Sequence, residues 1–396
     1  MTQTLPKYPN RPIYYLGHNN APSVTGEERV VSLAAVTKMD YIASVLNRLG
    51  RRVCFISMAG PVRGSVSKGG TFELSDDVSL TLWPALPRGG KLNGFVNYIG
   101  LRRRTEEFLD SLGPEDTVVC YHSLEFCSLL PRAKRRAGFK LVLEVEELYS
   151  DVTGRPVDLE RERRSFAAAD AFIFPTRLLA EKVGTDGRPY ALCSGVYRPA
   201  PHVAERRGDG LVHVVYAGTL DPRKGGAAAA AAAGAFLDDL YAVHILGDGS
   251  AEQVAAIERA AEEATSSGRG CRVAYEGLKS GREFDAFVQG CNIGLSPQNP
   301  TAGFNESSFP SKVFMYLANG LDVVSVDLPV FEGGIRDVLT LCPDNAPETL
   351  AAAIESATRV RKESPERLLE KLDREFVAAL EPLLFDNVVR RAENVN

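Results

Sequence analysis

The chain has 396 residues, a formal net charge of −5, 44% hydrophobic residues and 24% charged residues. This length favours two domains, and the average composition excludes a mainly disordered chain, a collagen and a disulfide scaffold. No apolar run approaches the roughly 20 residues that a bilayer crossing needs, and residues 1–12 lack the apolar core of a signal peptide. Seven cysteines are dispersed without a CxxC pair, which indicates free thiols in a reducing cytoplasm.

Short apolar runs alternate with helical patterns through the first half of the chain, which is typical of a parallel sheet with crossover helices. The strands expected there are 13–16, 53–57, 78–83, 118–121, 141–145 and 171–174. The expected helices lie near 36–49, 95–112, 124–136 and 159–168. A stretch rich in proline, charge and glycine follows at 197–210 and predicts a linker.

The same alternation resumes after the linker. Strands are expected at 212–217, 241–246, 271–275, 293–296 and 322–326, and helices at 226–237, 252–265, 282–290, 311–318 and 348–360. The alanine run 227–233 favours a helix that packs closely on a sheet. We therefore predict an α/β protein with two successive domains of parallel sheet and crossover helices, at 1–196 and 211–364.

Basic residues gather in three clusters of the first half, although the acidic chain as a whole argues against nucleic acid as a partner. The clusters are Arg102–Arg104, Arg132 with Lys134–Arg136, and Arg163-Arg164. Solvated helix faces would explain them. A surface for an anionic membrane or for a phosphorylated acceptor is the alternative, and it predicts a cytoplasmic protein with peripheral contact at the inner face of the membrane.

A strand end followed by glycine and two cations marks the start of the second half. Gly218 follows the strand 212–217, and Arg223 and Lys224 precede the next helix. Anionic ligands bind at the carboxyl ends of parallel strands, and helix N-terminal amides together with Lys224 could hold a diphosphate. An ordinary strand–loop–helix joint with exposed cations is the alternative.

A second candidate anion site lies at the start of the helix expected at 311–318. Ser307, Ser308 or Ser311 can cap this helix, and Lys312 in its first turn opposes the helix dipole unless an anion neutralises it. A capped core helix with a tolerated lysine is the alternative. The turn Gly247-Asp248-Gly249 after a strand is weaker evidence for the same kind of site, since such turns are common.

The order of these segments resembles the nucleotide-sugar domain of GT-B glycosyltransferases of the retaining family 4 type. The resemblance is carried by Ala217-Gly218-Thr219-Leu220-Asp221-Pro222-Arg223-Lys224-Gly225, Ile245-Leu246-Gly247-Asp248-Gly249, Tyr275-Glu276-Gly277-Leu278 and the run from Phe309 to Gly320. It implies the GT-B architecture, two Rossmann-like, doubly wound domains facing across a cleft, with helices of 365–396 crossing back to the first domain. It implies donor binding by Gly218, Thr219, Arg223, Lys224, Gly247, Gly277, Leu278, Ser308, Ser311 and Lys312.

Two departures from the family pattern concern the donor site. Thr219 stands where the family has an arginine, and Arg223 could supply that charge from another direction. The family also carries two glutamates, of which the second, the ribose ligand, falls at Met315, and methionine is a poor hydrogen-bond acceptor. The first falls at Ser307, with Glu306 beside it as the candidate sugar contact.

The first half supplies candidate catalytic residues at two expected strand ends. His122 follows the strand 118–121, where the family presents an active-site histidine, although a lone histidine can also be structural. Glu144, Glu146 and Glu147 end the next strand, and alternation puts Glu144 and Glu146 on one face. Acidic residues at a strand end suggest hydroxyl binding or base chemistry, with a solvated turn as the alternative.

We therefore predict a glycosyltransferase that moves a hexose-type sugar from a nucleoside diphosphate sugar to a glycan or lipid-linked acceptor in polysaccharide biosynthesis. The candidate catalytic residues are His122, Glu146 and Glu306, and no metal or other cofactor is expected because cations stabilise the leaving diphosphate. Retention of configuration is implied by the resemblance alone. Lys38 is a further candidate anion contact, and the role of the loop Gly17–Asn20 stays open.

Two other functions fit parts of the sequence. A non-catalytic, glycosyltransferase-like partner subunit would explain Thr219 and Met315. A sugar-nucleotide epimerase or hydrolase of the same fold would need a further acid–base set. Thermal shift with nucleoside diphosphates separates the partner from both enzymes, and donor turnover without acceptor separates the hydrolase from the transferase.

Overall fold

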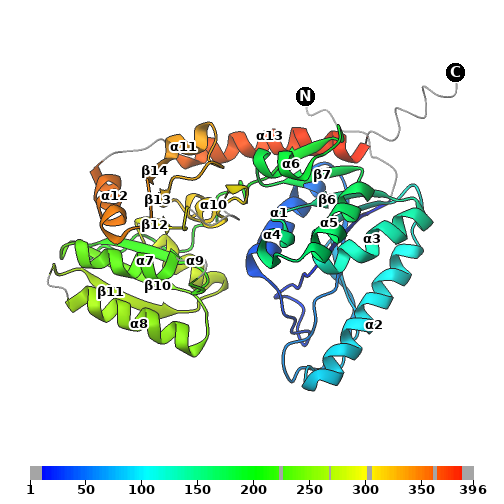
Figure 1. Ribbon diagram of the computed structural model, residues 1–396, viewed down its shortest axis with the longest axis horizontal. Helices are drawn as coiled ribbons and strands as arrows, with labels where there is room; N and C mark the ends of the chain where they lie inside the picture. The colour runs from blue at the N-terminus through cyan, green and yellow to red at the C-terminus, as the bar shows by residue number, and fades with distance from the viewer. Residues whose placement is uncertain (1–10, 223–225, 267–268, 301–305, 360–363, 386–396) are drawn as a thin grey trace. The chain divides into compact units, whose positions relative to one another are not determined.

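The computed structural model describes residues 11–222, 226–266, 269–300, 306–359 and 364–385 (Figure 1). The chain forms two compact units, Met1–Cys193 with Phe376–Asn396, and Ser194–Glu375. Residues 193–211 carry no helix or strand. Within the second unit, the Ala200 amide donates to the Ala318 carbonyl at 2.8 Å and the Val203 amide to Gln289 Oε1 at 2.8 Å.

The first unit is built on an eight-stranded sheet with the order β3-β4-β2-β1-β5-β6-β7-β8. All neighbouring strands pair in parallel except β3 and β4, which are antiparallel. The strands are β1 (Ile13–Gly17), β2 (Val53–Ser57), β3 (Gly70–Ser75), β4 (Val78–Leu82), β5 (Thr117–Tyr121), β6 (Lys140–Glu144), β7 (Ala171–Phe174) and β8 (Tyr190–Leu192).

Helices cover this first sheet. They are α1 (Leu33–Arg48), α2 (Gly90–Asp110), α3 (Leu124–Ala137), α4 (Tyr149–Thr153), α5 (Pro156–Ala168), α6 (Arg177–Val183) and the end of α13 (Pro365–Phe385). Helix α3 packs against both α2 and α5 (Figure 1). The last turn of α3 carries Lys134, Arg135 and Arg136, which complement the negative end of the helix dipole, and Gly138 ends the helix with φ +77°.

The second unit is built on a six-stranded sheet with the order β11-β10-β9-β12-β13-β14, in which every pair is parallel. The strands are β9 (Val212–Ala217), β10 (Tyr241–Leu246), β11 (Arg272–Gly277), β12 (Ile293–Ser296), β13 (Asp322–Val326) and β14 (Leu339–Cys342). The helices are α7 (Gly226–Ala233), η1 (Gly234–Phe236), α8 (Ala251–Ser266), α9 (Gly281–Gln289), α10 (Lys312–Ala318), α11 (Gly334–Val338) and α12 (Pro347–Arg359).

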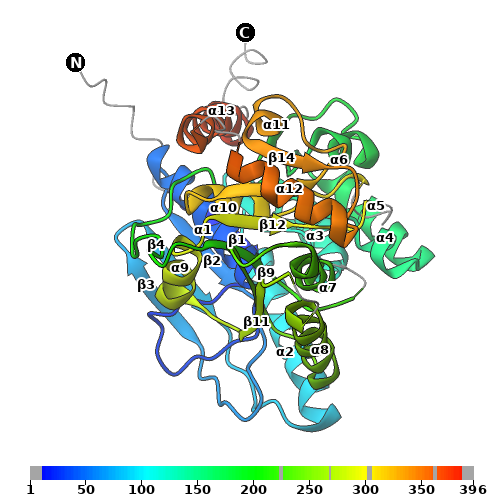
Figure 2. The same cartoon turned by 90° about the vertical axis from the view of Figure 1, so that its left-hand side faces the viewer.

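The alanine run forms the core-facing helix of this second unit. Helix α7 lies between α8 and α12 and packs against both (Figure 2). Ala230 and Ala231 are fully buried, because small side chains let the helix approach its neighbours closely. The two sheets confirm the predicted α/β class. Among the described residues, no helix is long and apolar enough to cross a membrane.

Candidate active site

Among the parallel strands of each sheet, the strand order reverses direction at one place, and ligands of open α/β sheets bind beside such a place, at the carboxyl ends of the strands. In the first sheet the reversal lies between β1 and β5, and in the second between β9 and β12. The loops that follow these strands therefore locate the candidate site in each unit.

Three glycine loops meet at the carboxyl edge of the second sheet. The Gly218 amide donates to the Leu246 carbonyl at 3.0 Å, and the Gly247 amide donates to the Gly277 carbonyl at 3.1 Å. A Cβ atom on Gly247, where φ is +154°, would lie 1.8 Å from the Gly218 carbonyl oxygen. The structure thus brings together Gly218, Gly247 and Gly277, which the sequence predicted as parts of one donor site.

The Lys312 side chain lies over the first of these loops. A Cβ atom on Gly218 would lie 2.4 Å from Lys312 Cε and 2.8 Å from its Nζ, so the ammonium sits directly against the glycine backbone. Nζ also lies 5.2 Å from the centre of the Tyr216 ring. Helix α10, which begins at Lys312, is fixed to the end of β9 because the Ala217 amide donates to Tyr316 Oη at 2.8 Å.

The other predicted donor residues have varied surroundings. Thr219, Leu278, Ser311 and Glu306 are exposed, and Ser308 is half-buried. Ser311 occupies the N-cap position of α10, but its side chain makes no capping hydrogen bond, so the predicted capping role is wrong for this residue. Arg223 and Lys224 lie outside the described residues.

His122 directly follows β5, as predicted, but it is buried with 3% of its surface exposed. Its Nε2 lies 3.2 Å from Cys127 Sγ and 3.5 Å from Glu162 Oε1. The rings of Tyr149 and Phe166 lie 5.4 Å and 5.3 Å from its ring. Residues from α4 and α5 thus cover this side chain.

Burial of His122 lowers its pKa to about 3, so the imidazole is neutral at pH 7. We expect His122→Ala to reduce the free energy of unfolding by about 1–3 kcal/mol at pH 7, as for other buried contacts that are lost. The unfolded histidine binds a proton below about pH 6.5 and the folded one does not, so this contribution shrinks as pH falls from 6.5. Urea unfolding at pH 7 and pH 5 measures both effects.

The exposed His202→Ala is the matched control and should leave unfolding unchanged, since its side chain is 69% exposed. Activity per folded molecule should stay near wild type in both variants. An unchanged unfolding midpoint in His122→Ala would contradict the structural role.

Lys38 is buried in the first unit, where its ammonium donates to Glu146 and, at 2.6 Å, to the Cys193 carbonyl oxygen. Burial opposes the charge, but Glu146 and the other neighbouring groups outweigh it, so the pKa of Lys38 is raised. The ammonium already has a carboxylate partner, so the predicted free anion contact at Lys38 is wrong. Glu146, which the sequence predicted as catalytic, is the carboxylate of this ion pair, and 23% of its side chain is exposed.

Glu144 ends β6 inside the same cluster and is fully buried. Tyr15 Oη donates to its Oε2, whereas Oε1 has no hydrogen-bond partner among the described residues. Burial, followed by the charge of Glu146, raises the pKa of Glu144 to about 8. Glu144 and Glu146 thus share one electrostatic environment, which favours the protonated, neutral form of Glu144.

This raised pKa predicts a pH-dependent stability. The folded state holds the Glu144 proton up to about pH 8, and the unfolded chain releases it near its ordinary value of about 4.3. The contribution of Glu144 to the free energy of unfolding is therefore complete at pH values below the ordinary glutamate pKa. It is lost as pH rises toward 8, by at most about 1.4 kcal/mol per pH unit. Glu144→Gln should flatten that slope in urea unfolding between pH 5 and pH 8. An unchanged slope would contradict the assignment.

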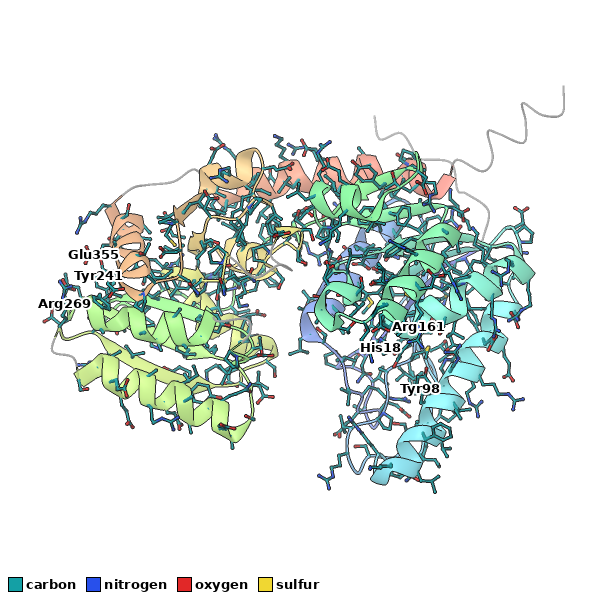
Figure 3. All side chains as sticks on the ribbon, in the orientation of Figure 1. His18, Tyr98, Arg161, Tyr241, Arg269 and Glu355 are labelled. Carbon is teal, nitrogen blue, oxygen red and sulfur yellow. The ribbon has the colours of Figure 1, made fainter. Side chains whose placement is uncertain are left out.

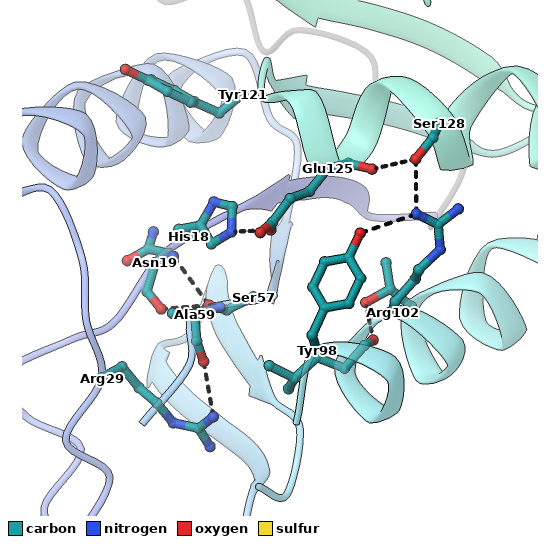
Figure 4. Close-up of polar contacts among 12 residues, drawn as sticks. His18, Asn19, Arg29, Ser57, Ala59, Tyr98, Arg102, Tyr121, Glu125 and Ser128 are labelled. Carbon is teal, nitrogen blue, oxygen red and sulfur yellow. Dashed lines mark hydrogen bonds and ion pairs between the residues drawn. The ribbon is translucent and has the colours of Figure 1, made fainter. Parts of the chain in front are cut away.

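The loop after β1 carries a histidine–carboxylate pair that the sequence did not reveal (Figure 4). His18 Nε2 lies 2.9 Å from Glu125 Oε2, and the two side chains are 33% and 41% exposed. This hydrogen bond to His18 lowers the pKa of Glu125. The adjacent Asn19 amide donates to Ser57 Oγ at 3.1 Å, which ties the loop to the end of β2.

The His18–Glu125 pair thus occupies the switch point of the first sheet and remains accessible. An imidazole held by a carboxylate can accept or donate a proton to a ligand hydroxyl. The sequence signal was a histidine directly after the first strand, at Gly17-His18, but its partner lies on α3, more than a hundred residues later.

The architecture is shared with solved structures of low sequence identity. Sucrose-phosphate synthase from Thermosynechococcus elongatus is 15% identical over 98% of this chain and 100% of its own, with a TM-score of 0.64. The UDP-forming α,α-trehalose-phosphate synthase of Burkholderia xenovorans, in complex with glucose-6-phosphate, is 12% identical over 97% and 100%, with a TM-score of 0.63. Anabaena HepE, in complex with UDP and glucose, is 13% identical over 97% and 100%, with a TM-score of 0.59.

These likenesses span both units, and they establish the predicted fold. The chain has the GT-B fold. No protein-family model matches the sequence, and no curated protein matches it either. The likeness in structure thus extends over nearly the whole chain at low sequence identity.

Proposed function

We propose that the protein is a glycosyltransferase that moves a hexose-type sugar from a nucleoside diphosphate sugar to a glycan or lipid-linked acceptor. The observation that carries the proposal is the Lys312 ammonium against Gly218, at the carboxyl edge of the second sheet. Structures with the same fold hold UDP with glucose, or glucose-6-phosphate, which supports nucleotide and sugar ligands for this fold.

The second unit would bind the nucleoside diphosphate. Backbone approach is possible at Gly218 because the residue has no side chain, and Lys312 supplies a positive charge within reach of a phosphate bound there. Positive charge fixed at this point stabilises the diphosphate as the sugar bond breaks. Arg223 and Lys224 are proposed to add to it, and with these cations the reaction needs neither a metal nor another cofactor.

The first unit would position the acceptor. His18 and Glu125 form the exposed polar pair at its switch point, and they replace His122 in this role because His122 is enclosed. Glu146 is partly exposed and keeps its proposed contact with a hydroxyl group, while Glu306 is exposed in the second unit and keeps its proposed contact with the sugar. Membership of family 4, retention of configuration and a role in polysaccharide biosynthesis belong to the proposal through the sequence motifs alone.

A non-catalytic partner subunit is the second candidate, and two residues favour it. Thr219 is exposed where the family pattern has an arginine. Met315 is half-buried on α10 at the position of the ribose-binding carboxylate, and its thioether is a weak acceptor. A subunit of this kind would not turn over a nucleotide sugar, so release of nucleoside diphosphate from a panel of donors decides between the two functions.

Removing the Lys312 ammonium should weaken nucleotide binding. A charge-assisted contact contributes roughly 1.5–3 kcal/mol, so Lys312→Ala should raise the Kd for UDP or GDP by about 10-fold or more. Isothermal titration calorimetry measures this. Arg272→Ala removes an exposed cation from the amino end of β11 in the same unit and should leave the Kd unchanged. Equal affinity in Lys312→Ala and wild type would contradict the donor site.

A further inference from the structure

Helix α2 exposes a row of large apolar side chains in its first half. Leu92, Phe95, Val96 and Ile99 follow the spacing i, i+3, i+4 and i+7, which places them on one face of a helix. Their exposed fractions are 74%, 63%, 43% and 46%. A face of this pattern is normally buried in a core, so the described part of the first unit leaves it without a covering element. We call these four residues the apolar stripe.

A strongly basic cavity of about 540 Å³ lies among α2, α3 and α5, in the same unit. Its arginines are Arg102 from α2, Arg132 and Arg135 from α3, and Arg161 and Arg164 from α5; Cys127, Ser128 and Pro131 complete the lining. Figure 3 labels Arg161 on α5 and Tyr98 on α2. We call this cavity the arginine pocket.

Carboxylates neutralise only part of this charge. Arg161 lies 3.3 Å from Asp158 and Arg164 lies 2.8 Å from Glu160. By contrast, Arg102 donates to a neutral group, Ser128 Oγ, at 2.8 Å.

Arg132 and Arg135 make no hydrogen bond or ion pair within the described part of the chain. Within the described residues, the guanidinium groups of Arg132 and Arg135 therefore carry positive charge that no carboxylate balances. Arg102 instead acts on Glu125, whose pKa is lowered by the hydrogen bond to His18 and by the charge of Arg102. Arginine matches a phosphate group in planar, bidentate geometry, so such a pocket suits a phosphate oxyanion.

The apolar stripe and the arginine pocket are continuous. Arg102 follows Ile99 by three residues, which continues the same face of α2. The Tyr98 hydroxyl lies 3.5 Å from a guanidinium nitrogen of Arg102 and so joins the two features (Figure 4). A tyrosine between an apolar and a charged region is typical of the interface between lipid tails and headgroups.

We propose that this face binds an anionic phospholipid surface, with a lipid phosphate in the arginine pocket and the apolar stripe among the outer acyl carbons. Neither the stripe nor the pocket alone selects this ligand, because apolar side chains also suit a protein partner and arginines also suit a free phosphate. Their continuity on one helix face matches the phospholipid, which carries a phosphate and an apolar chain in one molecule. The inference does not depend on the proposed sugar transfer.

Flotation of the full-length protein with vesicles tests this inference. Vesicles of phosphatidylcholine with 30% phosphatidylglycerol should bind the protein, and vesicles of phosphatidylcholine alone should bind at least 10-fold less. The double variant Arg132→Gln/Arg135→Gln should reduce binding to the anionic vesicles by about 10-fold or more. The matched control Arg104→Gln/Arg163→Gln removes the same charge from exposed arginines outside the pocket and should reduce binding less than about 3-fold.

The apolar contribution is tested by Leu92→Ser/Ile99→Ser, which should reduce binding to anionic vesicles by at least 5-fold while circular dichroism and the unfolding midpoint stay unchanged. Equal loss of vesicle binding in the two arginine double variants would overturn the role of the arginine pocket, since diffuse electrostatic attraction to the vesicles would then explain the binding. Tight binding of glycerol phosphate without binding to vesicles would identify a free phosphate ligand and overturn the lipid. Sedimentation that shows a dimer dissociated by the serine variant would assign the stripe to a second copy and also overturn it.

Discussion

Replacing Lys38 with methionine is expected to lower the free energy of unfolding by about 3 kcal/mol. Removing one partner of a buried ion pair typically costs 3–5 kcal/mol because the other charge stays buried without compensation. We expect the lower end of this range because 23% of the Glu146 side chain is exposed and can be hydrated. The Cys193 carbonyl oxygen also loses its 2.6 Å donor, which adds to the loss.

Urea unfolding of Lys38→Met at pH 7 measures this loss, and two further variants separate its causes. Lys182→Met removes a lysine whose ion pair with Asp151 lies at the surface, with exposed fractions of 38% and 32%, so it should cost less than about 1 kcal/mol. The double variant Lys38→Met/Glu146→Gln removes both charges and should recover a large part of the stability. A loss no greater than that of Lys182→Met would contradict the buried pair.

The sequence predicted the second unit better than the first, for a physical reason. Its strands β9 to β13 are short apolar runs that end in glycine or polar loops. Both the hydrophobic pattern of each strand and the residues that end it can therefore be recognised in a short stretch of sequence. The contacts among Gly218, Gly247 and Gly277 follow from one rule, since parallel strands bring their carboxyl ends to the same edge. The family motifs contain the same residues.

Elements at the edges of the sheets were missed. β3 has alternating exposed and half-buried residues and pairs with β4 in the antiparallel direction, so it lacks the continuous apolar run of a buried parallel strand. In β8 and β14, no more than half of the residues are buried, so these strands also lack a continuous buried run. Helix α2 begins at Gly90, before the predicted start at residue 95, and the apolar spacing of its early turns was overlooked.

The burial of single polar groups could not be predicted, because it depends on residues distant in the chain. His122 looks like any histidine at a strand end, and Phe166 and Glu162, which lie on α5, enclose it. The sequence distance from Lys38 to its acceptor at Cys193 is 155 residues. Local patterns show where a strand ends, but they do not show which helix covers that end.

Replacing Gly247 with alanine is expected to lower the free energy of unfolding of the second unit by about 3 kcal/mol or more. The new Cβ would lie 1.8 Å from the Gly218 carbonyl oxygen, which belongs to the backbone and cannot rotate away. Overpacking of this kind costs roughly 1–3 kcal/mol or more, and the positive φ of +154° adds backbone strain. Because the displaced loop carries Gly218, the affinity for UDP should fall with the stability.

Two glycines of the same site serve as controls and separate stability from ligand binding. Gly277→Ala introduces a side chain at φ +74° with no atom within 4 Å, so strain alone should cost about 1–2 kcal/mol. Gly218→Ala would meet the flexible end of Lys312, at 2.4 Å from Cε, and Tyr216 Oη at 3.2 Å, so the closest contact is relieved when the lysine moves aside, at a smaller cost in stability than a backbone clash. Its ammonium would then leave the phosphate position, and the Kd for UDP should rise as in Lys312→Ala. Urea unfolding and calorimetry on the three variants test these expected effects. Equal losses in the free energy of unfolding for Gly247→Ala and Gly277→Ala would mean that the loops of Gly218 and Gly247 are not in backbone contact.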